Sequence, residues 1–160
     1  MILKSIRLHP FGGTLDRTYD LARTVAVLLG PNEAGKSTLR QALHHALFTP
    51  TKQTKTQAEA TVGRWYPRPT GDHAAVTLVF EHDGRAWTLT KRWGAGAASS
   101  LSAAGAAAIG EAAAVQEAVA TFLGHNEATG RLVLYTGQAE LARTIGALEE
   151  AGKDDALRSV

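Results

Sequence analysis

The chain has no cysteine among its 160 residues, which excludes disulfide bonds and metal sites built from thiolates. It also lacks any apolar run near the roughly 18 residues that a membrane-spanning helix needs. The opening stretch MILKSIRLHPFGG has neither a long apolar core nor a small-residue cleavage site, and so does not resemble a secretory signal. We therefore expect a cytoplasmic protein with no membrane partner.

A strong excess of charge is missing too, because the net charge is only +2. Acidic side chains concentrate late in the chain, where residues 94–160 carry eight of them against four basic ones. The more basic first part could face phosphates, but near-neutrality gives no strong electrostatic case for DNA. The histidines are scattered apart from His44 and His45, which we expect to be ordinary surface or boundary residues and not a metal site. The length and an apolar fraction of 44% suit one compact domain.

The most informative stretch is LLGPNEAGKSTLRQALHHAL, residues 28–47. From Gly30 to Ser37 it fits G-x-x-x-x-G-K-[ST] without a gap. The preceding VAVLLG, residues 25–30, is short and continuously apolar, as a strand buried on both faces should be. After the loop, one helical stripe holds Leu39, Ala42, Leu43, Ala46 and Leu47. The motif therefore lies between a predicted strand and an amphipathic helix, as a phosphate-binding loop requires.

This spacing suits phosphate because glycines let the backbone amides turn inward, where the positive end of the following helix reinforces them. Lys36 would bridge the β- and γ-phosphates, the Ser37 hydroxyl would bind Mg²⁺, and Thr38 would lie near the α-phosphate. The predicted ligand is ATP with Mg²⁺. The candidate binding residues are Gly30, Pro31, Asn32, Glu33, Ala34, Gly35, Lys36, Ser37 and Thr38.

The other predicted elements frame this loop. Residues 2–8 alternate apolar and polar as a half-buried strand, FGG at 11–13 is a turn, and residues 18–21 are a plausible partner strand. Residues 49–73 have the composition of a long loop, and two alternating runs around Asp83-Gly84 predict a hairpin. Residues 94–114, rich in Ala, Gly and Ser, are variable and could hide another hairpin.

The final third is predicted to alternate helix and strand. Residues 114–124 favour a helix that ends at Gly124, with Val115, Val119, Phe122 and Leu123 on one face. Residues 131–135, RLVLY, favour a strand, followed by the loop TGQAE and a helix over 141–158 with a break near Gly152. We find no internal repeat. We expect one lobe over 1–160, divided into 1–48, 49–73, 74–114 and 115–160.

The stretch GPNEAGKST resembles the P-loop of ABC-type ATPase heads in the SMC, RecF and SbcC group, and most closely SbcC-like and YhaN-like bacterial coiled-coil ATPases. ILKSIRLHPFG resembles the start of that family's first strand pair, and VLYTGQAEL at 133–141 resembles the segment entering its Q-loop. The resemblance implies an α/β P-loop NTPase fold. It further implies the N-terminal, incomplete lobe of an ABC-type head, with a mixed sheet and an antiparallel β-hairpin subdomain.

By this resemblance, Gln138 would be the Q-loop glutamine that reaches Mg²⁺ and the water near the γ-phosphate, so that Lys36 and Gln138 form the catalytic pair. Ser37 and Gln138 would be the metal-binding side chains. The sequence departs from the family at Gly12-Gly13, where many members have a basic residue near the nucleotide, and at Ala139, where a glycine is common. Arg7 and Lys4 are the weak remaining candidates for contacts from that first turn.

A Walker B strand, four apolar residues followed by Asp and Glu, is missing. VTLVFEH at 76–82 comes nearest, but it has Glu81 where Asp is required and reads as one arm of the hairpin. LSAAG at 101–105 resembles the family's signature motif but precedes Gln138, whereas the signature should follow the Q-loop. In the family, signature and Walker B lie in a C-terminal lobe beyond a coiled coil. We therefore expect the chain to need that lobe, and a second head, to complete the site.

The first hypothesis is accordingly the ATP-binding lobe of an SMC/SbcC-like ATPase in DNA repair or chromosome maintenance, associated with the nucleoid and hydrolysing ATP only when completed. The alternative is a nucleotide-sensing interaction module without catalysis of its own. A small-molecule P-loop kinase ranks third because no arginine-rich lid is evident. DNA is a partner implied by the resemblance. Four basic residues near Trp65-Tyr66 could contact it: Lys52, Lys55, Arg64 and Arg68. The favoured interpretation is instead that the two aromatic residues anchor this loop to its own domain.

Overall fold

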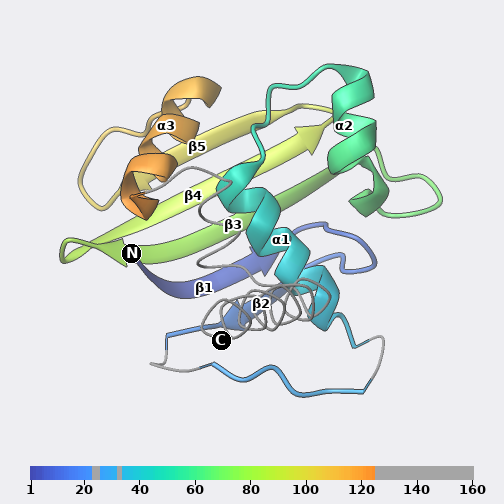
Figure 1. Cartoon of the computed structure of the whole chain (residues 1–160), viewed down its shortest axis with the longest axis horizontal. Coiled ribbons are helices and arrows are strands. Elements are labelled where there is room, and N and C mark those ends of the chain that lie inside the picture. The colour runs from blue at the N-terminus through green and yellow to red at the C-terminus, as the bar shows by residue number, and fades with distance from the viewer. Residues whose placement is uncertain (23–25, 32–33, 125–160) are drawn as a thin grey trace, which may run out of the picture. The chain divides into compact units, whose positions relative to one another are not determined.

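The computed structural model describes residues 1–22, 26–31 and 34–124, all within a unit that spans Met1–Gly124 (Figure 1). Asn32, Glu33 and Gln138 lie outside the described residues, as do the predicted strand at 131–135 and helix at 141–158. The elements in chain order are β1 (Ile2–Leu8), β2 (Arg17–Asp20), α1 (Lys36–Phe48), α2 (Lys55–Thr61), the 3₁₀ turn η1 (Gly63–Trp65), β3 (His73–His82), β4 (Arg85–Gly94), β5 (Ala98–Ala103) and α3 (Ala112–Leu123).

The five strands form one sheet in the order β2-β1-β3-β4-β5. The hairpin predicted at Asp83-Gly84 is confirmed as β3 and β4, and both turn residues have positive φ, at 49° and 72°. The predicted first strand pair is confirmed as well, with Ile6 opposite Tyr19. Every neighbouring pair is antiparallel, so the described residues hold the antiparallel part of the expected fold and no parallel strands.

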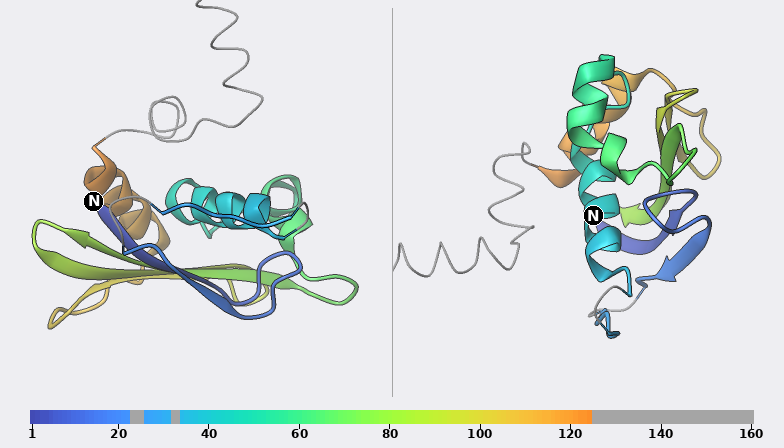
Figure 2. Two further views of the ribbon diagram at one scale, coloured as in Figure 1. Left: turned by 90° about the horizontal axis from the view of Figure 1, so that it is seen from below. Right: turned by 90° about the vertical axis from the view of Figure 1, so that its right-hand side faces the viewer.

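The three α-helices lie on one face of this sheet, as Figure 2 shows. Because strand side chains alternate between faces, every second residue of the strands enters the layer beneath the helices. The predicted stripe on α1 is confirmed: four of its five members are buried and Leu43 is partly buried. The helix predicted at 114–124 is confirmed as α3, which ends at Gly124 with a φ of 74°. Within the described ranges, no helix is both long enough and apolar enough to cross a membrane.

The sheet's two edges differ. At β5, Leu101 forms an isolated antiparallel bridge with Ile109, in which each backbone amide donates to the other's carbonyl at 2.9 and 2.8 Å. Residues 94–114 therefore contain β5 and a return segment that pairs with it, as the possible second hairpin suggested. At the other edge, β2 is only four residues long.

The prediction of a buried strand at 25–30 is wrong for the residues that the structure describes. Residues 26–30 form no strand, and Val27 and Leu29 are 70% and 90% exposed. A strand buried on both faces needs neighbouring strands and a layer on each side. None of the five described strands pairs with this segment, so its apolar side chains remain in solvent.

The prediction of a long loop over 49–73 is also wrong, because the segment contains α2 and η1. Thr54 begins α2 with a capping box: its hydroxyl accepts a hydrogen bond from the Gln57 amide, and the Gln57 side chain accepts one from the Thr54 amide. A Thr followed three residues later by Gln is the sequence signal for this cap. The predominantly polar composition of the segment obscured it.

The expectation of surface or boundary positions for His44 and His45 is wrong as well. Both side chains are buried, at 6% and 5% exposure. His45 shares a hydrogen bond of 2.8 Å with the Thr49 hydroxyl and lies near the rings of Phe11 and Trp93. Packing of α1 against both the sheet and the β1–β2 turn makes this side of the helix an interior one.

Candidate nucleotide-binding site

The start of α1 presents backbone donors that have no partner within the helix. Gly35 is the N-cap residue, with a φ of +86° that favours glycine, and no side chain caps the helix. The first intrahelical bond runs from the Leu39 amide to the Gly35 carbonyl at 2.9 Å. The amides of residues 36–38 therefore precede the helical ladder, at the positive end of the helix dipole. Such amides are suited to an anion.

The side chain of Lys36 folds across the loop that precedes it. Its ammonium nitrogen donates hydrogen bonds to the carbonyl oxygens of Gly30 and Pro31, at 2.6 and 2.7 Å. A weaker turn contact joins the Ala34 amide to the Pro31 carbonyl at 3.3 Å. The structure thus brings the first glycine of the motif and its lysine together. The cation lies against the carbonyls of the first two residues of the motif.

The two hydroxyl residues of the motif differ in surroundings. Ser37 is exposed. Thr38 is partly buried beneath the β1–β2 turn: a Cβ built on Gly12 would lie 3.2 Å from the Thr38 methyl group and 3.3 Å from the Trp65 ring. Gly12 also has a φ of +59°, and its amide donates to the Trp65 carbonyl at 2.6 Å. The positive φ and the close packing together explain why glycine occupies this position.

The weak candidates for basic contacts from that turn are engaged elsewhere. Arg7 forms a two-bond ion pair with Asp16, at 2.6 and 2.8 Å, and Lys4 lies 2.9 Å from Glu81. The guanidinium of Arg7 holds the pKa of the Asp16 carboxyl below its ordinary value. Neither side chain joins Lys36 at the loop.

Residues 1–61 match the family described as "AAA domain". An AAA domain is a P-loop ATPase domain, so the match implies nucleotide binding by the part of the chain that carries the motif, and such domains typically bind ATP with Mg²⁺. The sequence has no match among curated proteins. The matched residues include the whole P-loop motif and α1.

The far end of the same helix is fixed from inside the protein. The Lys91 ammonium, on β4, donates to the Thr49 carbonyl at 3.0 Å and to the Gln116 side-chain oxygen at 2.6 Å. Gln116, on α3, donates in turn to the Leu47 carbonyl at 3.0 Å. These bonds satisfy carbonyls at the C-terminal end of α1, which otherwise lack partners. The alternating pattern of β4 does not predict this contribution, because a lysine in such a strand is expected to face solvent.

The aromatic residues of the segment 49–73 anchor it to its own domain, as the favoured interpretation held. Trp65 stacks on buried Phe11 with ring centroids 5.4 Å apart, and the Arg64 guanidinium lies 5.3 Å from the centre of the Trp65 ring. Tyr66 packs against Gly94, where a Cβ would lie 2.8 Å from the phenol oxygen. Neither aromatic residue projects freely as a platform for bases.

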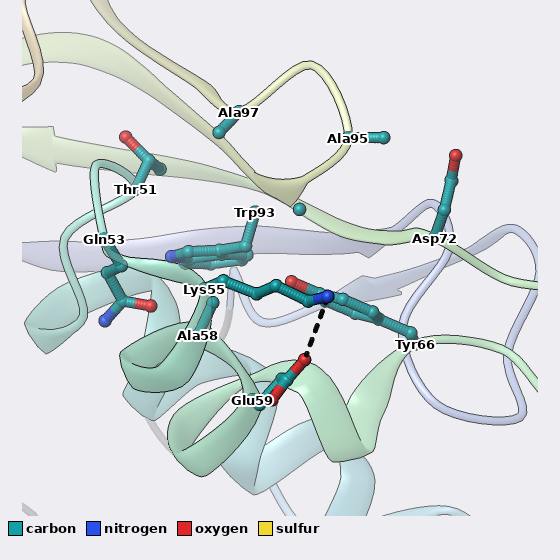
Figure 3. A pocket seen from close by; sticks show the side chains of 11 residues that line it. Thr51, Gln53, Lys55, Ala58, Glu59, Tyr66, Asp72, Trp93, Ala95 and Ala97 are labelled. Atoms are coloured by element: carbon teal, nitrogen blue, oxygen red, sulfur yellow. Dashed lines mark ion pairs between the residues drawn. The ribbon is translucent and has the colours of Figure 1, made fainter.

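A cavity of about 410 Å³ lies beside Tyr66, between α2 and the turn that joins β4 to β5 (Figure 3). Lys55 and Glu59 of α2 reach across its mouth with their charged groups 4.0 Å apart. Asp72 lies on the opposite rim, and Trp93 forms part of the wall. None of the lining residues belongs to the P-loop motif. The cavity is therefore separate from the candidate nucleotide site.

The sequences that resembled missing catalytic motifs have structural roles. VTLVFEH lies in β3, paired with β4 on one side and β1 on the other. Glu81, in its Asp position, forms the ion pair with Lys4. Leu101 of the LSAAG stretch is buried in β5. Among the residues that the structure describes, neither stretch therefore contributes a catalytic carboxylate to the loop.

Proposed function

We propose that the chain is the ATP-binding N-terminal lobe of an SMC/SbcC-like ATPase. The observation that supports this most directly is that the amides of residues 36–38, which precede the helical ladder, share the loop with the Lys36 ammonium, which is bonded to the carbonyls of Gly30 and Pro31. Lys36 would exchange its two carbonyl partners for phosphate oxygens. The amides would donate hydrogen bonds to the other phosphate oxygens. Ser37 would hold Mg²⁺, and the bound ion would neutralise part of the phosphate charge.

The exposed apolar segment at residues 26–29 supports a lobe that is completed by further strands. Val27, Leu28 and Leu29 are 70%, 44% and 90% exposed, although they lead directly into the loop. A continuously apolar strand of this kind is normally found inside a sheet that has helices on both faces. We propose that a C-terminal lobe completes the sheet around it and brings the signature motif and Walker B to the nucleotide, with Gln138 as the Q-loop glutamine. A second head would then close the site, and DNA is the partner implied by the resemblance.

Titration of the full 160-residue chain with ATP and Mg²⁺ by calorimetry tests the binding half of this proposal. We expect saturable uptake by the wild type, loss of uptake in Lys36→Ala, and no change in Lys52→Ala, which removes an exposed lysine outside the motif. Absence of uptake by the wild type, with or without an added C-terminal lobe, would contradict nucleotide binding.

A phosphate-release assay tests the catalytic half. We expect negligible hydrolysis by the chain alone and turnover after addition of a C-terminal lobe that carries signature and Walker B. Robust turnover by the chain alone, abolished by Lys36→Ala, would refute an incomplete site.

A second candidate is a nucleotide-sensing interaction module without catalysis of its own. The ion pair between Glu81 and Lys4 favours it, because the acidic residue nearest to a Walker B pattern is already committed to the sheet. Both candidates predict ATP uptake. Only the first predicts that complementation produces hydrolysis, so the assay above distinguishes them.

A further inference from the structure

Tyr19 of β2 lies against the N-terminal end of α1. Its cross-strand partner is Ile6, which is fully buried, and directly opposed residues of an antiparallel pair share a face. Tyr19 therefore points to the side of the sheet that α1 covers, where its ring packs against the core. The phenol oxygen reaches the loop: a Cβ built on Gly35 would lie 4.0 Å from it.

This position adds a hydroxyl donor to the group already present at the loop. Gly35 immediately precedes the Lys36 side chain and the amides of residues 36–38, which have no partner within the helix. Within the part of the chain that the structure describes, the Tyr19 hydroxyl takes part in no hydrogen bond. A partly buried phenol beside the N-terminal end of this helix can donate a hydrogen bond to an incoming oxygen.

Arg17 adds positive charge at the same place. It lies two residues before Tyr19 on β2, and so on the same face of the strand. The carbon at the centre of its guanidinium is 4.9 Å from the centre of the Tyr19 ring. The neighbouring carboxylate, Asp16, is paired with Arg7, and among the described residues no carboxylate pairs with Arg17. The guanidinium stiffens the ring by a cation–π contact and leaves its charge uncompensated.

We propose that the Tyr19 hydroxyl donates a hydrogen bond to a phosphate of the bound nucleotide, with Arg17 as the residue that positions the ring and adds positive potential. The inference rests on the proposed nucleotide binding and adds two residues from outside the P-loop motif. Phosphate is the expected acceptor for two reasons. The hydroxyl lies beside Gly35, next to the amides that would bind phosphate, and a phenol O–H donates a strong hydrogen bond to an anionic oxygen.

Tyr19→Phe tests the proposal because it removes one oxygen and keeps the ring that packs against the core. The affinity of the full chain for ATP-Mg²⁺ and for inorganic tripolyphosphate is measured by calorimetry, together with the melting temperature. A hydrogen bond to a charged group contributes about 1.5–3 kcal/mol, so we expect affinity for both ligands to fall about tenfold or more. Arg17→Gln should weaken both by a smaller factor, with a reduced dependence on salt.

Matched controls are Tyr66→Phe, which removes a phenol oxygen at the separate cavity, and Arg85→Gln, which removes an exposed charge at the β3–β4 hairpin; both should bind as the wild type does. Unchanged affinity in Tyr19→Phe, with Lys36→Ala still defective, would overturn the proposal and leave nucleotide binding intact. Loss for ATP but not for tripolyphosphate would overturn it too, since the hydroxyl would then serve the nucleoside. Uptake of neither ligand by the wild type would mean that the proposed function itself fails.

Discussion

The side-chain nitrogen of Lys91 donates a hydrogen bond to the backbone carbonyl of Thr49 at 3.0 Å, although the lysine is only 1% exposed. Burial lowers the pKa of Lys91 to about 7. Because α1 begins at Lys36 of the P-loop and ends at Phe48, a buried titratable group is bonded to the opposite end of the helix that would carry the phosphate site.

Lys91 should make stability rise with pH above neutrality. Its folded-state pKa of about 7 lies below the value of 10.5 for an exposed lysine, so between these values the unfolded chain binds more protons. Below pH 7 the buried lysine is charged, and the free energy of unfolding is lowered by the full cost of burying that charge. As the pH rises from 7 towards 10.5 the folded lysine is neutral, so the free energy of unfolding increases. The slope should reach about 1.4 kcal/mol per pH unit at most.

Urea denaturation of the wild type and Lys91→Met at pH 7, 8 and 9 measures this slope. We expect the slope to be nearly absent in Lys91→Met, whatever that variant's absolute stability. Lys52→Met, which replaces an exposed lysine, should behave as the wild type does. Equal slopes in the wild type and Lys91→Met would show that Lys91 stays protonated in the folded state.

Gly94→Ala should destabilise the fold more than Gly84→Ala. Both glycines have positive φ, at 87° and 72°, so each alanine carries a conformational cost of about 1 to 2 kcal/mol. Only at Gly94 would the new Cβ also overlap the Asp72 carbonyl oxygen and crowd the Tyr66 phenol. We expect a total loss of about 3 kcal/mol or more there. Chemical denaturation compares the pair, and equal losses would mean that the segment around Asp72 yields without cost.

Tyr66→Phe should leave the fold as stable as before or make it more stable. The Tyr66 hydroxyl oxygen is buried and lacks a partner among the described residues, and its burial, with the charges of Asp72 and Glu59, raises the pKa of the phenol. An unpartnered buried polar group costs about 1–3 kcal/mol, so its removal should raise the free energy of unfolding by about 1 kcal/mol. A fall of that size in urea denaturation would instead reveal a bonded hydroxyl.

Leu29→Ser should reduce self-association without weakening the fold. Leu29 is 90% exposed, so its loss should change the free energy of unfolding by no more than about 0.5 kcal/mol. Leu78→Ala, at a fully buried position, should cost about 2–5 kcal/mol. Denaturation and light scattering of the two variants give the comparison. A comparable loss in Leu29→Ser would mean that the segment packs inside the chain.

Local patterns predicted the elements whose partners lie nearby in sequence. The Asp83-Gly84 turn brings β3 and β4 together because both residues adopt positive φ, and the apolar stripe of α1 predicted the buried side of that helix. The P-loop motif predicted a turn between a strand and α1, and the structure adds a bond from Lys36 to the carbonyl of Gly30, six positions earlier, which the motif alone does not predict. For the hairpin and the helix, local backbone preference and side-chain periodicity agree with the final contact.

The failures concern contacts between distant segments. Val27 is apolar as a buried strand residue should be, but burial depends on strands that its own sequence does not specify. Lys91 occupies a core position because Thr49 and Gln116, 42 and 25 residues away, supply acceptors that no pattern around Lys91 reveals. The approach of Tyr19 to Gly35 follows from strand register and helix docking together, and a lone tyrosine in a short strand gives no signal of it.

The bridge between Leu101 and Ile109 also affects where this protein could aggregate through the edges of its sheet. Exposed edge strands invite other chains to add to a sheet, and a chain that folds back on its own edge strand offers no free ladder at that point. A second molecule adding at β5 would first have to break the two hydrogen bonds of this bridge. Fibril growth from this sheet should therefore begin at β2, the edge whose neighbour in sequence leads to the exposed apolar residues.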